Sequence, residues 1–481
     1  MAPRYLGRAV RVTAERSGLR LLAYVQAIRA SSAWLRHAYR WLPESIREKV
    51  ARRLAERAAL AARMPDLPPL RVDAGVQPAR QEFPDRSNSG SQSSASGANL
   101  FGYFRGQFGL AEAARLYASA LLVSGNPVAL VDIDLDLPHG FGDESLASLL
   151  QDQAPHATSI VFVNPDYFEQ AIERIGRARM QGRYIIACWF WELERIPEQW
   201  LAAFELVDEV LVASGFIEEA VRAATTKPVT RIPLPLFERC DSGLQRSDIG
   251  LADDQFVFMT SFDFHSWVER KNPLATMEAF RRAFGGTDAK VKLVVKTSNG
   301  HLHPQALTQL LATTHHEPRI VIMDGIIEHA HLRAMQRCCD AYVSLHRAEG
   351  FGLGLAECMS MGKPVIATAW SGNLEFMTED NSCLVPAELT AIPRGQYLHA
   401  DGQRWAAPDV ETAASFMRRL VFEKGFAQGL GGRGRASITR QLSPKEVGKM
   451  LTERLEAIAL LRATSMSAQD KFVPATAEAR Q

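Results

Sequence analysis

Two glutamates and three glycines near residue 350 form the segment best suited to chemistry. Glu349 and Glu357 lie eight positions apart, with Gly350, Gly352 and Gly354 between them. Glycine lets a backbone turn sharply and approach a ligand closely. A helix is expected from about residue 353, and the N–H groups and dipole of a helix start suit a phosphate. Carboxylates accept paired hydrogen bonds from the vicinal hydroxyls of a ribose or hexose. The pattern therefore favours a nucleotide sugar as ligand.

Other glycine motifs do not fit this spacing. A dinucleotide-binding fingerprint needs G-x-G-x-x-G/A, but counting from Gly350 or Gly352 places Leu355 or Glu357 at the last position. A P-loop needs Ser or Thr after Gly-Lys, and Pro364 stands there. The remaining alternative is a glycine-rich turn with two solvated glutamates.

A second candidate segment carries positive charge. Arg270 and Lys271 precede Asn272 and Pro273, which suit the N-cap and the first position of a helix. Two cations at a helix start would neutralise a diphosphate. Lys296, at the end of the next expected strand, is a further candidate for the same task. The alternative for each of these cations is a solvated surface residue.

The elements that would position these residues alternate between strands and helices. Strands are expected at 128–133, 159–163, 184–188, 209–213, 256–261, 290–296, 319–323, 341–345 and 364–368, and helices at 110–123, 168–180, 273–284, 330–338 and 353–361. Such alternation predicts parallel sheets with helices on both faces. Ligands bind at the carboxyl ends of the strands in these sheets. We therefore expect an α/β protein with two doubly wound, Rossmann-like domains facing a cleft.

The domain boundaries follow from composition. We expect a basic helical N-terminal extension at 1–85, a Ser-rich linker at 86–98, an N-terminal Rossmann-like domain at 99–240, a C-terminal Rossmann-like domain at 241–463 and a disordered tail at 464–481. The linker contains six serines and two glycines among its thirteen residues, a composition typical of flexible segments.

Composition and charge exclude several classes of protein. The 55 Lys and Arg residues against 54 Asp and Glu give a net charge of +1, which argues against a nucleic-acid binder. The longest apolar run, 184–191, has eight residues, whereas a spanning helix needs about 20. The N-terminus does not read as a secretory signal. The six cysteines form no C-x-x-C pair, so we expect neither a zinc site nor a redox motif, and a reducing cytoplasm fits best.

The glutamate segment also carries a family resemblance. The motif from Glu349 to Glu357, continued by M-G-K-P-V-I-A at 361–367 and S-G-N at 371–373, resembles the retaining family 4, group 1 type, glycosyltransferases of the GT-B fold. The resemblance covers roughly residues 98–460 and is strongest at 256–386. One departure is Gly354, where the family usually has proline.

The resemblance implies a function. The enzyme would transfer a sugar from a nucleotide diphosphate sugar to an acceptor hydroxyl, with retention at the anomeric carbon. The setting would be bacterial cell-surface polysaccharide or glycolipid synthesis. The N-terminal Rossmann-like domain would face the acceptor, and the C-terminal one would bind the donor. The resemblance implies no bound cofactor and no metal. The close histidine pairs of the chain also lack a third ligand at a fixed spacing.

The resemblance also implies roles for residues. Glu349, Lys271 and Glu357 are the expected catalytic residues, with Glu349 on the sugar hydroxyls and Glu357 on the ribose. The full expected donor-binding set is Gly106, Gly109, Arg270, Lys271, Lys296, Asp324, Gly325, Ile326, Glu349, Gly350, Phe351, Gly352, Leu353 and Glu357. Within this set, backbone N–H groups at 351–353 would hold the phosphates, and residues 324–326 would lie against the base.

Three family positions are matched loosely. A family arginine after the first strand of the C-terminal domain has no clear counterpart, and His265 or Arg270 would replace it. A family histidine that touches the sugar is missing after the strand at 184–188. Trp191 and Glu192 occupy that region and would contact a sugar or acceptor; alternatively the aromatic rings are core and the glutamate caps a helix. Gly106 and Gly109, described above as donor-binding, fit the family's glycine loop with loose spacing.

Two alternative functions stay open. One is a nucleotide-sugar epimerase of the same fold, which would need no acceptor. The other is a non-catalytic nucleotide-sugar-binding protein, against which the intact pair Glu349 and Glu357 argues. The expected partners are a nucleotide sugar and a saccharide or lipid-linked saccharide acceptor, with no nucleic acid.

The N-terminal arm suggests a peripheral membrane contact. Residues 1–65 hold 14 Lys and Arg against 4 Asp and Glu. Trp34, Tyr39 and Trp41 lie among arginines, a mixture that suits a membrane interface. We therefore expect residues 1–64 to dock on the anionic inner face of the cell membrane. The alternative is an arm that packs on the catalytic domains or on a partner protein.

Overall fold

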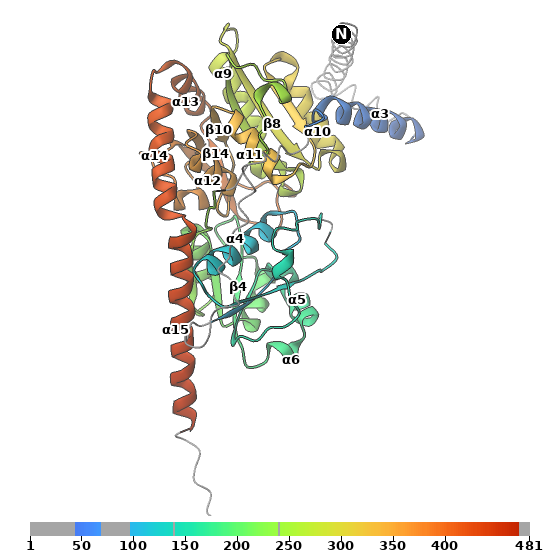
Figure 1. Cartoon of the computed structure of the whole chain (residues 1–481). Helices are drawn as coiled ribbons and strands as arrows, with labels where there is room; N and C mark the ends of the chain where they lie inside the picture. The colour runs from blue at the N-terminus through green and yellow to red at the C-terminus, as the bar shows by residue number, and fades with distance from the viewer. Residues whose placement is uncertain (1–43, 69–96, 138–139, 239–240, 471–481) are drawn as a thin grey trace, which may run out of the picture. The chain divides into compact units, whose positions relative to one another are not determined.

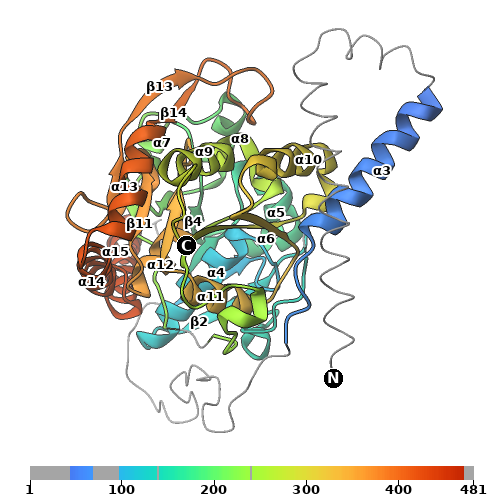
Figure 2. The ribbon, with the colours of Figure 1, turned by 90° about the horizontal axis from the view of Figure 1, so that it is seen from above.

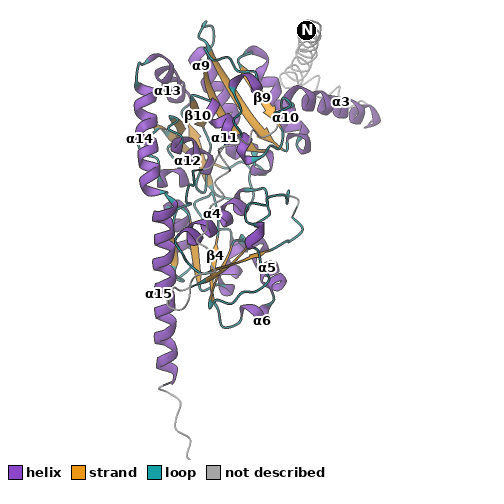
Figure 3. Ribbon diagram, viewed as in Figure 1, coloured by secondary structure: helices purple, strands orange, loops and turns teal. Residues whose placement is uncertain are grey.

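The computed structural model describes residues 44–68, 97–137, 140–238 and 241–470. They form two compact units, each made of two separate stretches of chain. The N-terminal unit contains the described residues of 97–238 and 438–470, and the C-terminal unit contains 44–68 and 241–437. In both units strands alternate with helices (Figure 3). This confirms the predicted fold class of two doubly wound α/β domains.

The N-terminal unit is built on a six-stranded parallel sheet with the order β2-β1-β3-β4-β5-β6. Its strands are β1 (Ala98–Gly102), β2 (Val128–Asp132), β3 (Thr158–Val161), β4 (Tyr184–Cys188), β5 (Glu209–Val212) and β6 (Val229–Arg231). Its helices are α4 (Gly109–Val123), α5 (Phe168–Ile175), α6 (Arg177–Met180), α7 (Gly215–Arg222) and α15 (Pro444–Asp470). The predicted strand at 184–188 matches β4, while the helix expected at 168–180 is broken at Gly176, which has φ +101°.

Helix α15 brings the end of the chain back to the N-terminal unit. It packs against α4, and a Cβ at Gly448 would lie 2.0 Å from Ser124 Oγ, so only glycine allows this close approach. Arg454 donates to both carboxylate oxygens of the buried Glu209, at 2.8 and 2.7 Å. The structure therefore differs from the expected division, because 438–463 belongs with the first sheet. The helix also continues to Asp470, into the stretch expected to be a disordered tail.

The C-terminal unit holds a second six-stranded parallel sheet, with the order β12-β11-β10-β7-β8-β9. Its strands are β7 (Phe256–Asp263), β8 (Val291–Ser298), β9 (Ile320–Asp324), β10 (Ala341–Ser344), β11 (Val365–Thr368) and β12 (Cys383–Val385). The strand order reverses between β7 and β10. Ligands bind at such a switch point, beyond the carboxyl ends of the strands. The loops that follow β7 and β10 are therefore where a site is expected.

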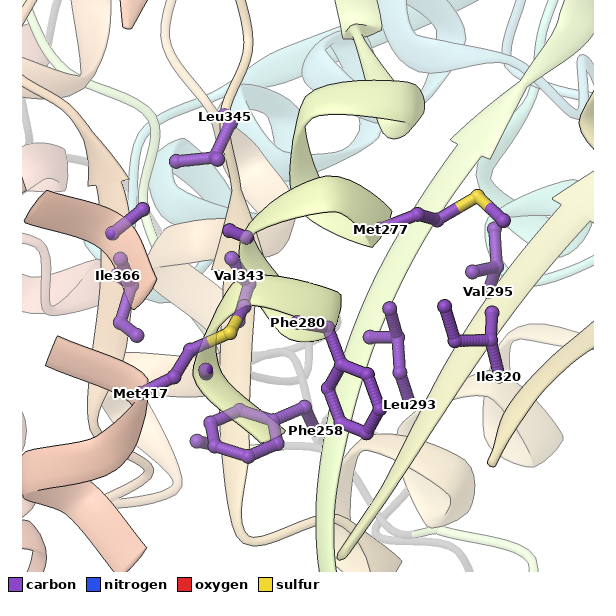
Figure 4. Close-up of a cluster of buried hydrophobic side chains, with 14 of the residues drawn as sticks. Phe258, Met277, Phe280, Leu293, Val295, Ile320, Val343, Leu345, Ile366 and Met417 are labelled. Carbon is purple, nitrogen blue, oxygen red and sulfur yellow. The ribbon is translucent and has the colours of Figure 1, made fainter. Parts of the chain in front are cut away.

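Helices cover both faces of this sheet (Figure 1). They are α8 (Val268–Lys271), α9 (Pro273–Phe284), α10 (Pro304–Ala312), α11 (His329–Cys338), α12 (Leu353–Ser360), α13 (Val410–Phe422) and α14 (Phe426–Gln441), the last of which ends in the N-terminal unit. Helix α9 points Met277 and Phe280 at the sheet, where Phe280 lies near Phe258 of β7 and Leu293 of β8 (Figure 4). Burial of this cluster is the main driving force for packing the helices on the strands.

The N-terminal extension contributes α3 (Glu44–Ala62) to the C-terminal unit. Its last turns pack against α10 (Figure 2), and Ala58 and Ala62 are buried in the core cluster of this unit. Residues 86–96 of the expected linker, and the aromatic residues proposed to reach a membrane, lie outside the described residues, whereas Ala98 at the expected end of the linker already begins β1. Among the helices that the structure describes, none combines the length and the apolar character that crossing a bilayer requires.

A two-stranded antiparallel hairpin was not predicted. Strands β13 (Ala387–Ala391) and β14 (Arg404–Pro408) follow β12 and form a small separate sheet. Trp405 anchors the hairpin, since it is buried and Arg347 lies over its ring at 5.1 Å. The Ala406 N–H also donates to Arg347 O at 2.9 Å. The hairpin thus packs on the loop that follows β10.

Candidate active site

The predicted glycine turn follows β10 and leads into α12. Gly352 is the N-cap of this helix and has φ +90°, a conformation that favours glycine. A Cβ at Gly372 would lie 1.9 Å from Gly350 O, and the Gly372 N–H donates to Glu349 O at 2.8 Å. Backbone therefore packs directly on backbone here. The first-turn N–H groups of a helix have no intrahelical acceptors, so the turn presents donors at the start of α12.

Glu349 lies in a cationic environment. Its side chain is 11% exposed; Oε2 lies 3.2 Å from Arg270 Nη1, and Oε1 lies 2.5 Å from Lys271 Nζ. Burial alone would raise the pKa of Glu349, but the charges of Lys271 and Arg270 outweigh it and lower this pKa to about 2. The Glu349 N–H donates to Ser371 Oγ at 2.8 Å. Glu349 is thus a fixed, ionised carboxylate at neutral pH.

The basic pair precedes α9 as expected, but it belongs to a short helix that was not predicted. Arg270 and Lys271 end the short helix α8, before α9 begins at Pro273. Asn272 is the N-cap of α9 by position, but its side chain donates to Leu345 O at 2.8 Å instead of capping the helix. Arg270 Nη1 also donates to Ala348 O at 2.8 Å. The loop after β7 is therefore tied to the loop after β10, and both cations meet Glu349.

Glu357 lies in polar surroundings within α12. It is 7% exposed. Its Oε2 accepts a hydrogen bond from Gln336 Nε2 at 3.1 Å, and its Oε1 lies 3.2 Å from His329 Nε2. Burial alone would raise the pKa of Glu357, and the contacts with His329 and Gln336 lower it below the usual range. The sequence did not indicate His329 or Gln336 as partners, because they lie 28 and 21 residues away along the chain.

The buried amine of Lys296 does not meet a carboxylate. Its Nζ donates to Thr297 O and Gly325 O, each at 2.6 Å, and burial lowers its pKa to about 8. It holds the loop after β9 in place. Asp324 in this loop accepts from Thr297 Oγ1 at 2.9 Å, while Ile326 is 64% exposed. In the structure Lys296 therefore holds the loop after β9, and its expected role in neutralising a diphosphate stays a prediction.

His265 lies on the turn after β7 but contacts another histidine. Its Nδ1 is 3.2 Å from His303 Nε2, and its backbone N–H donates to Asp263 Oδ1 at 2.8 Å. Burial and the neighbouring His265 lower the pKa of His303. Of the two residues expected to replace the family arginine, Arg270 is the one that meets Glu349.

The sequence-predicted residues of the N-terminal unit show one clear difference. Gly106 O accepts from Arg115 Nη1 at 2.7 Å, and Gly109 begins α4. Trp191 is 3% exposed, its ring lies 4.8 Å from that of Trp200, and its Nε1 donates to Arg195 O at 2.8 Å. Trp191 is therefore a core residue. Its ring does not face a ligand as expected, and the alternative of a core position fits instead.

Glu192 is half-buried and follows Trp191 in the loop after β4.

A buried histidine beside the glycine turn was not predicted from the sequence. His346 is fully buried, with Nδ1 3.1 Å from Ser344 Oγ and Nε2 3.1 Å from Asn373 Oδ1. Burial lowers its pKa, so it is neutral at physiological pH. The histidine lies two residues after the end of β10. Its position at the carboxyl end of a predicted strand could have indicated it. Within the described ranges, no three His, Cys, Asp or Glu residues gather as a metal site would require.

A family match and structural likenesses agree with this geometry. Residues 255–392 match the family described as glycosyl transferases group 1. The match runs from the start of β7 to the end of β13 and includes both glutamates. No curated protein sequence matches this chain.

Solved structures are similar to this chain, and two of them, with TM-scores above 0.5, share its fold. Sucrose-phosphate synthase from Thermosynechococcus elongatus is 16% identical, with 76% of this chain and 100% of that chain covered at a TM-score of 0.56. Anabaena HepE in complex with UDP and glucose is 14% identical, with 75% and 99% covered at 0.53. The pneumococcal O-GlcNAc transferase GtfA, in complex with UDP and GlcNAc, is 15% identical with 63% and 57% covered at 0.46. The fold is GT-B, and together with the family match it supports a glycosyltransferase.

Proposed function

We propose that this chain transfers a sugar from a nucleotide diphosphate sugar to an acceptor hydroxyl, with retention at the anomeric carbon. The observation that carries the proposal is the pair of buried carboxylates at the start of α12. Glu349 is neutralised by Arg270 and Lys271, and Glu357 is held by His329. A carboxylate that is held ionised in a fixed place can accept hydrogen bonds from sugar hydroxyls.

The cations would divide their charge between carboxylate and diphosphate. Lys271 is the more accessible of the two, with 20% of its side chain exposed against 6% for Arg270. We expect Lys271 Nζ to reach a bound phosphate while Arg270 keeps Glu349 in position. The N–H groups at 351–353 would supply further donors at the helix start. Charge neutralisation by these groups would require no metal, so transfer should continue in excess EDTA.

The proposed reaction needs no dedicated protein base. The bond between the anomeric carbon and the phosphate oxygen breaks, and a bond to the acceptor oxygen forms on the same face. The acceptor proton passes to the departing phosphate oxygen. The protein would contribute by orienting the sugar and stabilising the charge that develops on the diphosphate.

The acceptor is proposed to be a saccharide or a lipid-linked saccharide in cell-surface polysaccharide or glycolipid synthesis. A lipid-linked acceptor would be presented at the cytoplasmic face of the membrane, where the basic arm would dock. Co-sedimentation with anionic and neutral vesicles tests the docking, with the full chain compared to a chain that starts at residue 44. If the full chain does not pellet with anionic vesicles at low salt, the arm is not an anchor.

A ligand screen followed by product analysis tests the proposed function. Thermal unfolding is measured with UDP-, GDP-, dTDP- and ADP-sugars, where a ligand at 100 times its dissociation constant adds about 2.7 kcal/mol of stability. The anomeric configuration of the product is then read by proton NMR. Stabilisation by no nucleotide sugar, or an inverted product, contradicts the proposal. Conversion of the donor sugar without an acceptor would favour an epimerase, and binding with no turnover would favour a non-catalytic protein.

A further inference from the structure

Residues 63–68, which follow α3, run along the outer edge of the second sheet. Arg63 forms a parallel bridge with Asp324, and the Met64 N–H donates to Asp324 O at 3.1 Å. Because β9 is the edge strand of this sheet, the segment extends the sheet at its carboxyl end. The buried residues Ala58 and Ala62 anchor the preceding turns of α3 in the core. The segment is therefore an integral part of the C-terminal unit.

The segment also packs against Gly325. A Cβ at Gly325 would lie 2.9 Å from Met64 Cγ, so the glycine allows Met64 to approach. Lys296 Nζ holds Gly325 O at 2.6 Å. The residue after β9 is thus fixed by a lysine from β8 and by a methionine from the extension.

The far end of the segment contacts α11. His331 Nε2 lies 3.0 Å from Pro68 O, and this histidine is 8% exposed. His331 stands two residues after His329, which contacts Glu357 at 3.2 Å. The segment therefore touches both ends of the loop that joins β9 to α11. Between these ends Ile326 presents an apolar side chain, 64% exposed.

We propose that residues 63–68 form one wall of the nucleoside subsite and help to select the base. This inference rests on the proposed function, because it takes Glu357 as the ribose-binding group and 324–326 as the base-binding loop. Half-buried Met64 and exposed Ile326 offer apolar atoms, and a methionine thioether contacts aromatic rings favourably. The N-terminal extension would thereby contribute to donor recognition independently of any membrane contact.

Calorimetric titration of the full-length protein tests whether residues 63–68 form a wall of the nucleoside subsite. The probe is the nucleoside diphosphate whose sugar gives the largest shift in the screen above, with inorganic pyrophosphate as a phosphate-only comparison. Met64→Ala should weaken the nucleoside diphosphate about three- to tenfold, the range of a lost sulfur–aromatic contact. Pyrophosphate affinity should not change. Met64→Leu, which keeps the apolar volume, should bind within about twofold of the parent.

Two further variants control the experiment. Leu60→Ala alters an exposed residue of α3 and should leave all affinities unchanged. His331→Gln should remove the contact between His331 and Pro68 O. The affinities for nucleoside diphosphates with preferred and non-preferred bases should then differ less than in the parent. Each variant is compared at matched thermal stability, which separates a local effect from partial unfolding.

The outcomes distinguish the two proposals. If the parent binds nucleoside diphosphate and Met64→Ala binds it equally well, the wall is refuted and the proposed function stands. If Met64→Ala binds more tightly, the segment covers the subsite instead of completing it, and the wall is again refuted. If the parent binds no nucleoside diphosphate at all, both proposals fall.

Discussion

Glu349 and Glu357 flank the same helix start, yet their surroundings differ in charge. Glu349 contacts a guanidinium and an ammonium group, whereas Glu357 contacts an imidazole and a carboxamide. Two positive charges hold the first carboxylate ionised to strongly acidic pH, while the pKa of the second is lowered by its contacts with His329 and Gln336 and by the nearby charge of Arg333. The comparison shows that one motif places two buried carboxylates in different surroundings, one paired with cations and one bonded to an imidazole and a carboxamide.

The largest effect is expected from Glu349→Gln. The substitution removes the negative charge that Arg270 and Lys271 share, and breaking a buried pair costs about 3–5 kcal/mol. We expect the variant to fold with reduced stability and to lose roughly a hundredfold in transfer rate. Urea unfolding and a transfer assay measure the two effects. An unchanged rate would contradict the role given to Glu349.

The acid stability of the protein should report the same carboxylate. The pKa of Glu349 lies at about 2 in the folded state, against an ordinary value of 4.5. A lowered pKa means that this stabilisation is complete above pH 4.5 and is lost as the pH falls towards 2. The contribution is about 3 kcal/mol. Unfolding of the parent and of Glu349→Gln is compared at pH 6, 4 and 3. If the parent and the variant lose stability in parallel below pH 4.5, other carboxylates account for the loss of stability in acid.

Lys271→Ala should have an intermediate effect that depends on the ligand. A lost charge-assisted hydrogen bond costs about 1.5–3 kcal/mol, so nucleoside diphosphate should bind at least about tenfold more weakly. Nucleoside monophosphate should be affected less. Calorimetry with both ligands makes the comparison, and Arg270→Ala in the same assay shows whether the more buried cation acts on the ligand or only on Glu349. Equal losses for both ligands would reject the diphosphate contact.

The smallest effect is expected from Glu357→Gln. The carboxamide can still accept from Gln336 or His329, so stability should change by less than about 1 kcal/mol. Transfer should fall about tenfold, chiefly through a higher KM for the donor. A loss as large as that of Glu349→Gln would erase the distinction between the two sites.

Local patterns predicted the framework well. Apolar runs bounded by turn residues gave β4 and α9 at the observed bounds, and the glycine turn leads into α12 as expected. These features depend on near neighbours in the chain. The same holds for the positions of Glu349 and Glu357 on either side of the helix start.

Contacts between residues that lie far apart in the chain could not be predicted from the sequence. Nothing local indicates that Lys271 meets a carboxylate 78 residues away, or that Trp191 packs in the core rather than facing a ligand. The hairpin of β13 and β14 was missed because β13 is short and mostly exposed, so its apolar signal is weak. Helix α15 was not among the predicted helices, and periodicity cannot tell which sheet a helix will cover.

The return of α15 to the first sheet has a consequence for biosynthesis. The N-terminal unit needs residues 444–470 to cover α4 and to pair Arg454 with the buried Glu209. During translation these residues emerge roughly ten to fifty seconds after the last strand of the first sheet, at about 5–20 residues per second. Until then Glu209 lacks its Arg454 partner, although the Tyr184 hydroxyl can already donate to it, and the first domain to be synthesised cannot be the first to be completed. Premature termination before residue 444 would therefore damage the opposite end of the sequence, and a single proteolytic cut could not release either unit as an independent fragment.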